Sequence, residues 1–385
     1  MKKRVKYFVF LIVAVTCFVW SCDDYLDVVP DNVPTIDHAF RDKVGAERFL
    51  FTCYSYLPRK GQVMGDPALL GADDVWSHED ENYQRFVMNF YEYRIKQGRQ
   101  NSNEPLLNFW NGRLNGLNLY QGIRDCNVFL ENIDKVGADL RTPERNLWKA
   151  EVTFLKAYYH YFLLRMYGPI PLIRENLPVS AGIEEVRVYR EPFDDCVDYI
   201  VGLIDAVKDD LPLTIRDRTQ DMGRITRPIA LAIKAELLVM AASPLFNGNP
   251  DYAGLKDNRE VFLFKAEEDP SKWERAAIAC KEAIDLCAEA SIRLYEFPET
   301  SYDLSETTRQ VMTNRHVYLD KWNRELIWGY SRPNYATLWS VQFITIPYFT
   351  FNDVNRAQGY PILSPTLHGY RPLSQMLYEW LTAIF

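Results

Sequence analysis

Apolar residues recur at helical spacing along most of the chain up to about residue 290. In the segment 105–133 they lie mostly three or four positions apart, with slips. The segment 147–167 is apolar on nearly all sides, and its polar residues form one narrow stripe of Lys149, Thr153, Lys156 and His160. A helix with so narrow a polar face typically packs between other helices, and Gly168-Pro169 is a typical helix end. We therefore predict a long buried helix over residues 147–167.

Three further helices are predicted between residues 191 and 290. One begins at Pro192, carries two aspartates in its first turn, and is broken by Pro212. The second is rich in alanine and spans about 228–243. The third is expected to bury a face formed by Trp273, Ala276, Cys280, Ile284 and Cys287.

The predicted fold is all-α. Pairs of helices of this length build helical-repeat proteins, and the tetratricopeptide repeat has a period of about 34 residues. We therefore expect an α-α superhelix of tetratricopeptide-like helix pairs, with residues 22–290 as its scaffold. A generic all-α bundle is the alternative. Periodicity fades beyond Ala290, so residues 291–385 are expected to be loop-rich, with short strand-like pieces at 326–330 and 341–346.

The N-terminus has the pattern of a secretory signal. Four basic residues among the first six positions precede an uncharged apolar run over 7–19, which is shorter than the roughly 20 residues that span a bilayer. The following Ser21-Cys22 is similar to a lipoprotein cleavage site, although Trp20 fits that site poorly. We expect residues 1–21 to be removed and Cys22 to carry lipid. The alternatives are a soluble secreted protein and an uncleaved anchor.

Composition and charge exclude several functional classes. The chain has 44 basic and 52 acidic residues among 385, and this balance argues against a general nucleic-acid binder. Beyond Cys22 the remaining cysteines are odd in number, namely Cys53, Cys126, Cys196, Cys280 and Cys287. An odd set does not make a disulfide framework. Cys280 and Cys287 are expected to be buried core thiols.

Sequence motifs of enzymes are missing. The chain contains no nucleophile elbow, dinucleotide-binding glycine motif, phosphate-binding loop or zinc-protease motif, and its five histidines lack metal-ligand spacing. We therefore expect no catalysis, no cofactor and no metal. An acidic stretch around Trp76, which includes Asp73, Asp74 and Glu79, is compatible with a glycosidase acid–base pair, a calcium site or a solvated loop.

Aromatic residues make up 14% of the chain, which is a marked surplus. Trp110, Trp148 and Trp273 lie in predicted helices and are expected to belong to the core. Aromatic residues of the predicted loops either cover helix ends or stack on flat ligands such as sugar rings. This group consists of Trp76, Tyr83, Trp322, Tyr335, Trp339 and Tyr348.

Several motifs then occur together in a characteristic order. They are Cys22-Asp23-Asp24-Tyr25-Leu26-Asp27; Trp110 with Tyr120, Ile123 and Asn127; the helix from Ala150 to Tyr159 that closes in Leu164-Arg165-Met166-Tyr167-Gly168; Gly223-Arg224-Ile225-Thr226; and Ala241-Ala242-Ser243-Pro244-Leu245-Phe246-Asn247-Gly248. In this order they resemble the SusD/RagB family of nutrient-binding outer-membrane lipoproteins of Bacteroidota.

The resemblance implies a function and a partner. Such a protein is anchored by lipid in the outer membrane at the cell surface and binds oligosaccharides, or in some members peptides, without cleaving them. It sits on a SusC-like TonB-dependent barrel. The family continues beyond the position reached here, so a missing C-terminal part of the scaffold is expected to leave this chain unstable or inactive.

The ligand is expected at the loop Asp73–Tyr83. Trp76 would be a stacking platform with Asp74 and His78 as hydroxyl partners, and Tyr83 belongs to the same candidate set. Trp339 would be a second platform. Three functional classes stay open: a glycan-binding lipoprotein that feeds a transporter, a relative that captures peptides or glycoprotein fragments, and a surface glycoside hydrolase.

Overall fold

The computed structural model describes residues 36–58, 66–72 and 91–329. The expectations for the signal segment 1–21, for Cys22 and for all of Trp76, Asp74, His78, Tyr83 and Trp339 lie outside these residues. The helices are α3 Ile36–Ala39, α4 Lys43–Ser55, α5 Pro67–Gly71, α7 Tyr91–Lys96, α8 Leu119–Asn132, α9 Thr142–Tyr167, α10 Ile183–Val186, α11 Phe193–Val207, α12 Arg227–Ala242, α13 Ser271–Glu289 and α14 Glu306–Leu319. Short 3-10 turns, Ile133–Lys135 and Lys208–Asp210, follow α8 and α11.

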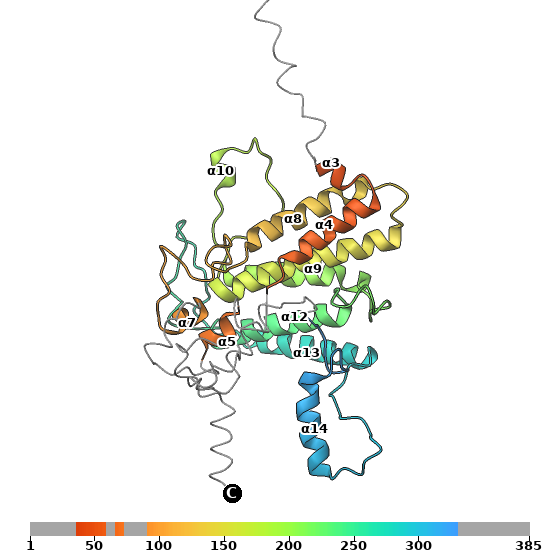
Figure 1. The fold of residues 1–385 in the computed structure, drawn as a ribbon. Coiled ribbons are helices and arrows are strands. Elements are labelled where there is room, and N and C mark those ends of the chain that lie inside the picture. The colour runs from red at the N-terminus through yellow and green to blue at the C-terminus, as the bar shows by residue number, and fades with distance from the viewer. Residues whose placement is uncertain (1–35, 59–65, 73–90, 330–385) are drawn as a thin grey trace, which may run out of the picture.

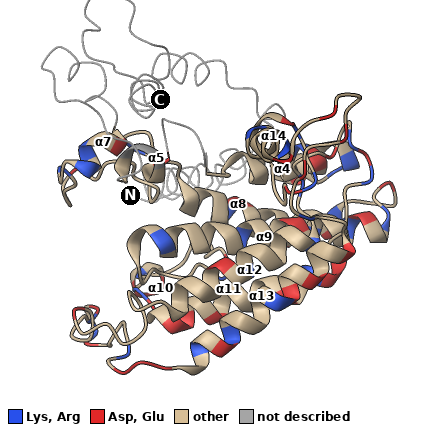
Figure 2. Ribbon diagram, turned by 90° about the horizontal axis from the view of Figure 1, so that it is seen from below, with Lys and Arg blue, Asp and Glu red and all other residues tan. Residues whose placement is uncertain are grey.

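The all-α prediction is confirmed for the described residues. They contain no strand, and their one isolated antiparallel bridge joins Lys256 to Phe262. Helices α4, α8 and α9 lie side by side at one end of the body, and α12 and α13 follow beyond α9 (Figure 1). Seen from below, α9, α11, α12 and α13 run next to one another (Figure 2).

Helix α9 is the centre of the core, as its nearly all-round apolar pattern predicts. Trp148, Phe154, Tyr159 and Tyr161 on this helix are each at most 1% exposed. It packs against α8 on one side and α11 on the other. The helix ends at Gly168, whose φ of 68° lies in the region that glycine tolerates best. The predicted end at the Gly-Pro pair is therefore confirmed.

The polar stripe of α9 is covered by protein in its second half. Lys156 donates a hydrogen bond from Nζ to the carbonyl of Arg174 at 2.5 Å. His160 is fully buried, and its Nδ1 lies 2.8 Å from the carbonyl of Lys156 while its Nε2 accepts the amide of Ile173 at 3.2 Å. Because a carbonyl only accepts, Nδ1 carries the proton and the imidazole is neutral. Burial lowers the pKa of His160 to about 3.

The predicted buried face of α13 is wrong for its largest residues. The face that contacts α12 consists of Ala276, Ala279 and Ala283, whereas Trp273 is 45% and Ile284 63% exposed. Alanines on α13 meet the alanine-rich α12, so the two backbones approach closely and the large side chains point outward. The expectation that Cys280 and Cys287 are buried is wrong, since both are partly exposed, while Cys53, Cys126 and Cys196 are buried.

The segment 105–118 is a loop rather than the first part of a helix. Leu107 and Leu114 have φ values of 48° and 50°, and Gly112 has a φ of 80°. These values break the helical path, while Leu106, Leu107 and Phe109 still fill the core. Trp110, expected in the core, is 38% exposed, whereas Trp148 is buried as predicted.

The region after Ala290 contains one helix that the sequence pattern does not reveal. Helix α14 begins after Ser305, whose side chain accepts the amide of Thr308, and extends away from α13 (Figure 1). No residue of α14 is buried, so no apolar periodicity marks it. The expected strand-like piece at 326–330 is not a strand over its described residues, and the piece at 341–346 lies outside them.

Candidate functional site

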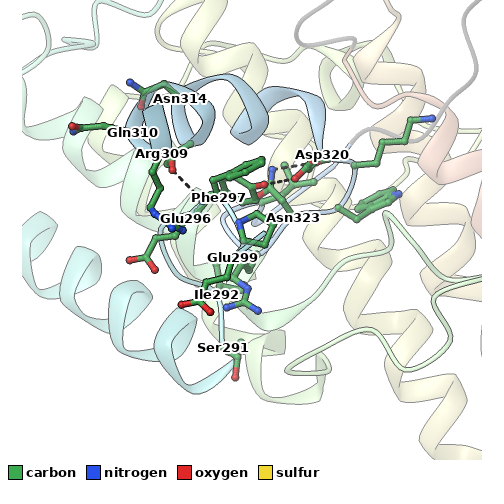
Figure 3. Close-up of a pocket in the computed structure, with 18 of the residues that line it drawn as sticks. Ser291, Ile292, Glu296, Phe297, Glu299, Arg309, Gln310, Asn314, Asp320 and Asn323 are labelled. Carbon is green, nitrogen blue, oxygen red and sulfur yellow. Dashed lines mark hydrogen bonds between the residues drawn. The ribbon is translucent and has the colours of Figure 1, made fainter. Parts of the chain in front are cut away.

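A cavity of about 1130 Å³ lies between the end of α13, the segment 291–299, α14 and the segment 320–326. Figure 3 shows that the labelled side chains around it come from the segment 291–299, from α14 and from the segment 320–326. Its lining combines three aromatic side chains, Tyr295, Phe297 and Trp322, with many charged and amide groups. A mixture of aromatic surface and convergent polar groups is typical of a site for a small polar ligand.

Hydrogen bonds join residues 292–295 to residues 324–325, and these two segments form part of the cavity wall. The chain turns out of α13 where Ile292 donates its amide to the carbonyl of Cys287 at 2.8 Å. Arg293 then donates to the carbonyl of Arg324 at 3.0 Å, and the amide of Tyr295 donates to Glu325 Oε2 at 2.8 Å. These bonds place residues 292–295 beside residues 324–325 although about 30 positions separate them in the sequence.

Helix α14 contacts the segments 291–299 and 320–326, through Phe297 of the first and Asn323 of the second. The amide of Phe297 donates to Thr313 Oγ1 at 3.0 Å, and the Phe297 ring lies 4.7 Å from the His316 ring, centre to centre. The side-chain amide of Asn323 donates to the carbonyl of Val317 at 2.7 Å. Because α14 contributes no buried side chain, these contacts determine its position.

Asp320 lines the cavity and makes two side-chain hydrogen bonds there. It accepts the hydroxyl hydrogen of Tyr295 and lies 3.0 Å from Nδ1 of His316. The hydrogen bond from Tyr295, followed by that from His316, lowers the pKa of the Asp320 carboxyl. The same hydrogen bond raises the pKa of Tyr295 to about 12, because the carboxylate disfavours a second negative charge. At neutral pH Asp320 is therefore an ionised acceptor, and Tyr295 keeps its proton.

Trp322 links this cavity to a second one of about 240 Å³ that is lined by residues of the 213–229 segment and of 326–329. Its backbone has a φ of 54°, an uncommon conformation for a bulky residue that often marks functional positions. The segment is anchored further on by Trp328, whose Nε1 donates to the carbonyl of Gly223 at 3.2 Å. The Trp328 ring packs edge-on against Tyr158 of α9 at 5.1 Å.

The cavity contains charges that have no partner within the described part of the chain. Arg218, Arg309 and Lys321 line it, and so do Glu296 and Glu299; none of them makes an ion pair or a side-chain hydrogen bond with another described residue. The close-up shows Arg309 and Glu296 among the labelled residues at the rim (Figure 3). A ligand in this cavity therefore meets both donors and acceptors that are free to bind it.

A groove of about 520 Å³ between α11, α12 and α13 differs in this respect. Its charges pair with each other, as with Lys234 and Asp205 at 2.7 Å and with Lys272 and Asp194 at 2.6 Å. The red and blue positions on these helices in Figure 2 show this mixture of charges. We assign this network to the joining of the three helices.

Sequence reasoning found only one residue of this cavity. Trp322 belongs to the loop aromatics that we expected to be available for stacking, and it lines the cavity. Tyr295, Phe297 and the residues of α14 were not among the candidates, because no motif or periodicity distinguishes them. The chosen residues Trp76, Asp74, His78, Tyr83 and Trp339 lie outside the described ranges, so their role stays a prediction.

Residues 24–237, more than half of the chain, match the model of a SusD-like family that is described as "Starch-binding associating with outer membrane". This chain belongs to the SusD-like family. The resemblance of its motifs to that family is thereby confirmed. No curated protein matches the sequence. Within the described ranges, no group of His, Cys, Asp and Glu side chains is arranged to hold a metal ion, and no helix there is long and apolar enough to cross a bilayer.

The solved structure of a similar protein supports the same fold for this SusD-like protein. The structure of a protein called BT4246 is 30% identical with a TM-score of 0.63, and the match covers 76% of this chain and 51% of that one. Matches also include a SusD-like protein (BF3747) from Bacteroides fragilis, with 18% identity, a TM-score of 0.48 and coverage of 68% and 40%. A third is the surface glycan-binding protein A from Bacteroides uniformis, with 20% identity, a TM-score of 0.45 and coverage of 74% and 51%. This chain spans about half the length of BT4246.

Proposed function

We propose that this SusD-like protein binds an oligosaccharide at the outer face of the outer membrane and delivers it to a SusC-like TonB-dependent barrel. The family description, starch binding in association with the outer membrane, supports both the ligand class and the location. In this proposal residues 1–21 are a signal peptide and Cys22 carries the lipid anchor. Two or more acyl chains on Cys22 would hold the protein stably at the membrane.

The observation that carries the ligand class is the chemistry of the cavity beside α14. Tyr295, Phe297 and Trp322 offer aromatic surface on which the C–H face of a sugar ring can stack. Each sugar hydroxyl both donates and accepts a hydrogen bond. Cations such as Arg309 and carboxylates such as Glu296, which have no partner among the described residues, are therefore satisfied together by one polyhydroxylated ligand.

The same argument favours a neutral glycan over an acidic one. The cavity lining has four cationic side chains and four carboxylates. The cationic ones are Arg218, Arg309, Lys321 and Arg324, and the acidic ones are Glu296, Glu299, Glu306 and Asp320. A uronate or sulfate group would approach carboxylates as well as cations, and it would gain little net attraction. A neutral sugar uses both sets of groups without that repulsion.

We propose binding without cleavage. A glycosidase needs a carboxyl group that keeps its proton near neutral pH as a general acid, usually because its pKa is raised. Asp320, a carboxyl group of the cavity lining, has the opposite property, since its hydrogen bonds lower its pKa. The loop Asp73–Tyr83, with Trp76, Asp74, His78 and Tyr83, and Trp339 remain proposed as further ligand contacts.

Affinity electrophoresis tests this function. The full-length protein would be run through native gels that contain starch, another neutral polysaccharide or a uronate-rich polysaccharide, with an empty gel and a non-binding protein as references. We expect one or more neutral polysaccharides to retard the protein and the uronate-rich one to leave it unretarded. Absence of retardation in every gel would contradict glycan binding. Release of reducing sugar from a retarding polysaccharide would instead identify a hydrolase.

A further inference from the structure

The thiols of Cys53 on α4 and Cys126 on α8 face each other inside the core. Both residues are 0% exposed, and burial, followed by the nearby Cys53 thiol, raises the pKa of the Cys126 thiol. Helices α4 and α8 lie next to each other over this stretch (Figure 1). In the structure both residues are free thiols.

The register of the two helices explains why these residues meet. Tyr56 lies against Gly122, where an added Cβ would be only 2.9 Å from the Tyr56 Cβ. At the other end the Phe49 and Phe129 rings are 6.4 Å apart, centre to centre. A later residue of α4 thus pairs with an earlier residue of α8, so the helices are antiparallel.

Cys53 and Cys126 both lie between these two contacts, the one of Tyr56 with Gly122 and the one of Phe49 with Phe129. Cys53 is three residues before Tyr56 and four after Phe49, and Cys126 is four residues after Gly122 and three before Phe129. About one helical turn from Gly122, the two cysteines are therefore opposite each other. A disulfide needs Cα atoms about 4.4–6.8 Å apart, and only closely packed helices provide that spacing.

We propose that Cys53 and Cys126 form a disulfide when the chain folds outside the reducing cytoplasm. Each sulfur loses its hydrogen and one S–S bond forms, while the two electrons and two protons reduce the disulfide of an oxidant, a thiol–disulfide oxidoreductase or oxidised glutathione, to two thiols. This inference rests on the proposed export of the protein and is independent of its ligand. The five cysteines beyond Cys22 then divide into one bonded pair and three free thiols.

Burial determines when this bond can form. In the folded chain desolvation raises the pKa of the Cys126 thiol far above its usual value, which makes the reactive thiolate scarce, and no oxidant reaches a fully buried sulfur. The bond therefore forms during folding, before α4 closes onto α8. Once formed, it is shielded from reductants in the same way.

The test is refolding of the reduced, full-length chain in a buffer of oxidised and reduced glutathione, followed by unfolding and alkylation of all free thiols. We expect mass spectrometry to find a peptide that links Cys53 to Cys126 and is about 2 Da lighter than its two free-thiol halves together. We also expect alkylation of these two residues to rise about tenfold when a reductant is added first. Cys196, which is buried without a bonded thiol neighbour, is the internal control and should be alkylated without reduction.

Two variants sharpen the result. Cys53→Ala should leave Cys126 fully alkylated without reductant, whereas Cys196→Ala should keep the linked peptide. A reductant should lower the thermal midpoint of the refolded parent protein but not that of Cys53→Ala. The proposal is overturned when Cys53 and Cys126 of the parent protein are alkylated as fully as Cys196 without reduction, or when either is linked to a different cysteine. Retardation by polysaccharide is measured separately, so either outcome leaves the proposed function untouched.

Discussion

The guanidinium of Arg224 forms a bidentate ion pair with the buried carboxylate of Glu151 in the middle of α9. Nε lies 3.1 Å from Oε1, and Nη2 lies 2.9 Å from Oε2. The Glu151 side chain is 1% exposed and that of Arg224 13%. The hydroxyl of Tyr54 on α4 accepts the amide of Ile225 at 3.1 Å, and burial, followed by the nearby charge of Glu151, raises the pKa of Tyr54. Three separate parts of the chain therefore meet at one buried charge.

Removal of the arginine should be strongly destabilising. Arg224→Met leaves a carboxylate in the core without its cation, and we expect the free energy of unfolding to fall by about 3–5 kcal/mol in urea denaturation. The matched control is Arg165→Met, because the Arg165–Glu236 pair is exposed at 44% and 42% and should contribute less than about 1 kcal/mol. Glu151→Leu in the Arg224→Met background should recover part of the loss. Equal effects of the two single variants would contradict this account.

The buried neutral His160 should make the fold sensitive to mild acid. Its pKa is about 3 in the folded chain and near 6.5 in the unfolded chain, so between these values only the unfolded state binds a proton there. This contribution is fully present above pH 6.5, and it is lost by about 1.4 kcal/mol per pH unit below that value. From pH 7 to pH 5 the free energy of unfolding should therefore fall by about 2 kcal/mol because of this residue.

The variant His160→Gln isolates this effect. Its stability should be lower than that of the parent protein at pH 7, since a packed imidazole with two hydrogen bonds is lost. Its decrease between pH 7 and pH 5 should nevertheless be smaller by about 2 kcal/mol in parallel urea titrations. An unchanged pH dependence in the variant would assign the acid sensitivity to other groups.

Gly248 and Gly202 should respond in opposite ways to alanine. Gly248 has a φ of 73°, and an added Cβ would lie 2.7 Å from the backbone nitrogen of Glu268. Gly248→Ala should therefore cost about 1–3 kcal/mol. Gly202 lies in α11 with nothing within 4 Å of the added Cβ, so Gly202→Ala should raise the stability by up to about 1 kcal/mol. Thermal unfolding of the two variants checks both signs.

Trp322 should carry a large share of the proposed glycan affinity. We expect Trp322→Ala to weaken binding to the retarding polysaccharide about tenfold in affinity electrophoresis, which corresponds to ~1.4 kcal/mol. Trp273→Ala is the control, since Trp273 is 45% exposed on α13 and does not line the cavity. Both variants should keep the helical circular dichroism of the parent protein. Undiminished retardation of Trp322→Ala would remove the cavity beside α14 from the ligand site.

The helices of the core were predictable because burial leaves a pattern in the chain. The end of α9 at Gly168 and the break after α12 before Pro244 follow from local backbone chemistry, which needs no tertiary information. Helix α14 could not be found in the same way. Its residues are all at least partly exposed, so their order along the chain carries no apolar period.

The candidate cavity could be predicted from the sequence only in part. An aromatic residue in a segment without periodicity was sufficient reason to consider Trp322. Its position beside Tyr295 and Phe297, however, depends on hydrogen bonds such as the one from Arg293 to the carbonyl of Arg324, which join distant parts of the chain. Contacts of this kind leave no trace in the local sequence.

The sequence by itself determined the all-α class, the central buried helix and the family to which the chain belongs, because hydrophobic period, capping residues and ordered motifs are local properties of the chain. The tertiary structure alone decided which face of α13 is buried, how α14 encloses a cavity, and that Arg224 meets Glu151 and Cys53 meets Cys126. The last two are pairings between residues more than 70 positions apart. The free energy of all these contacts comes from close packing and removal from water, which only the assembled fold provides.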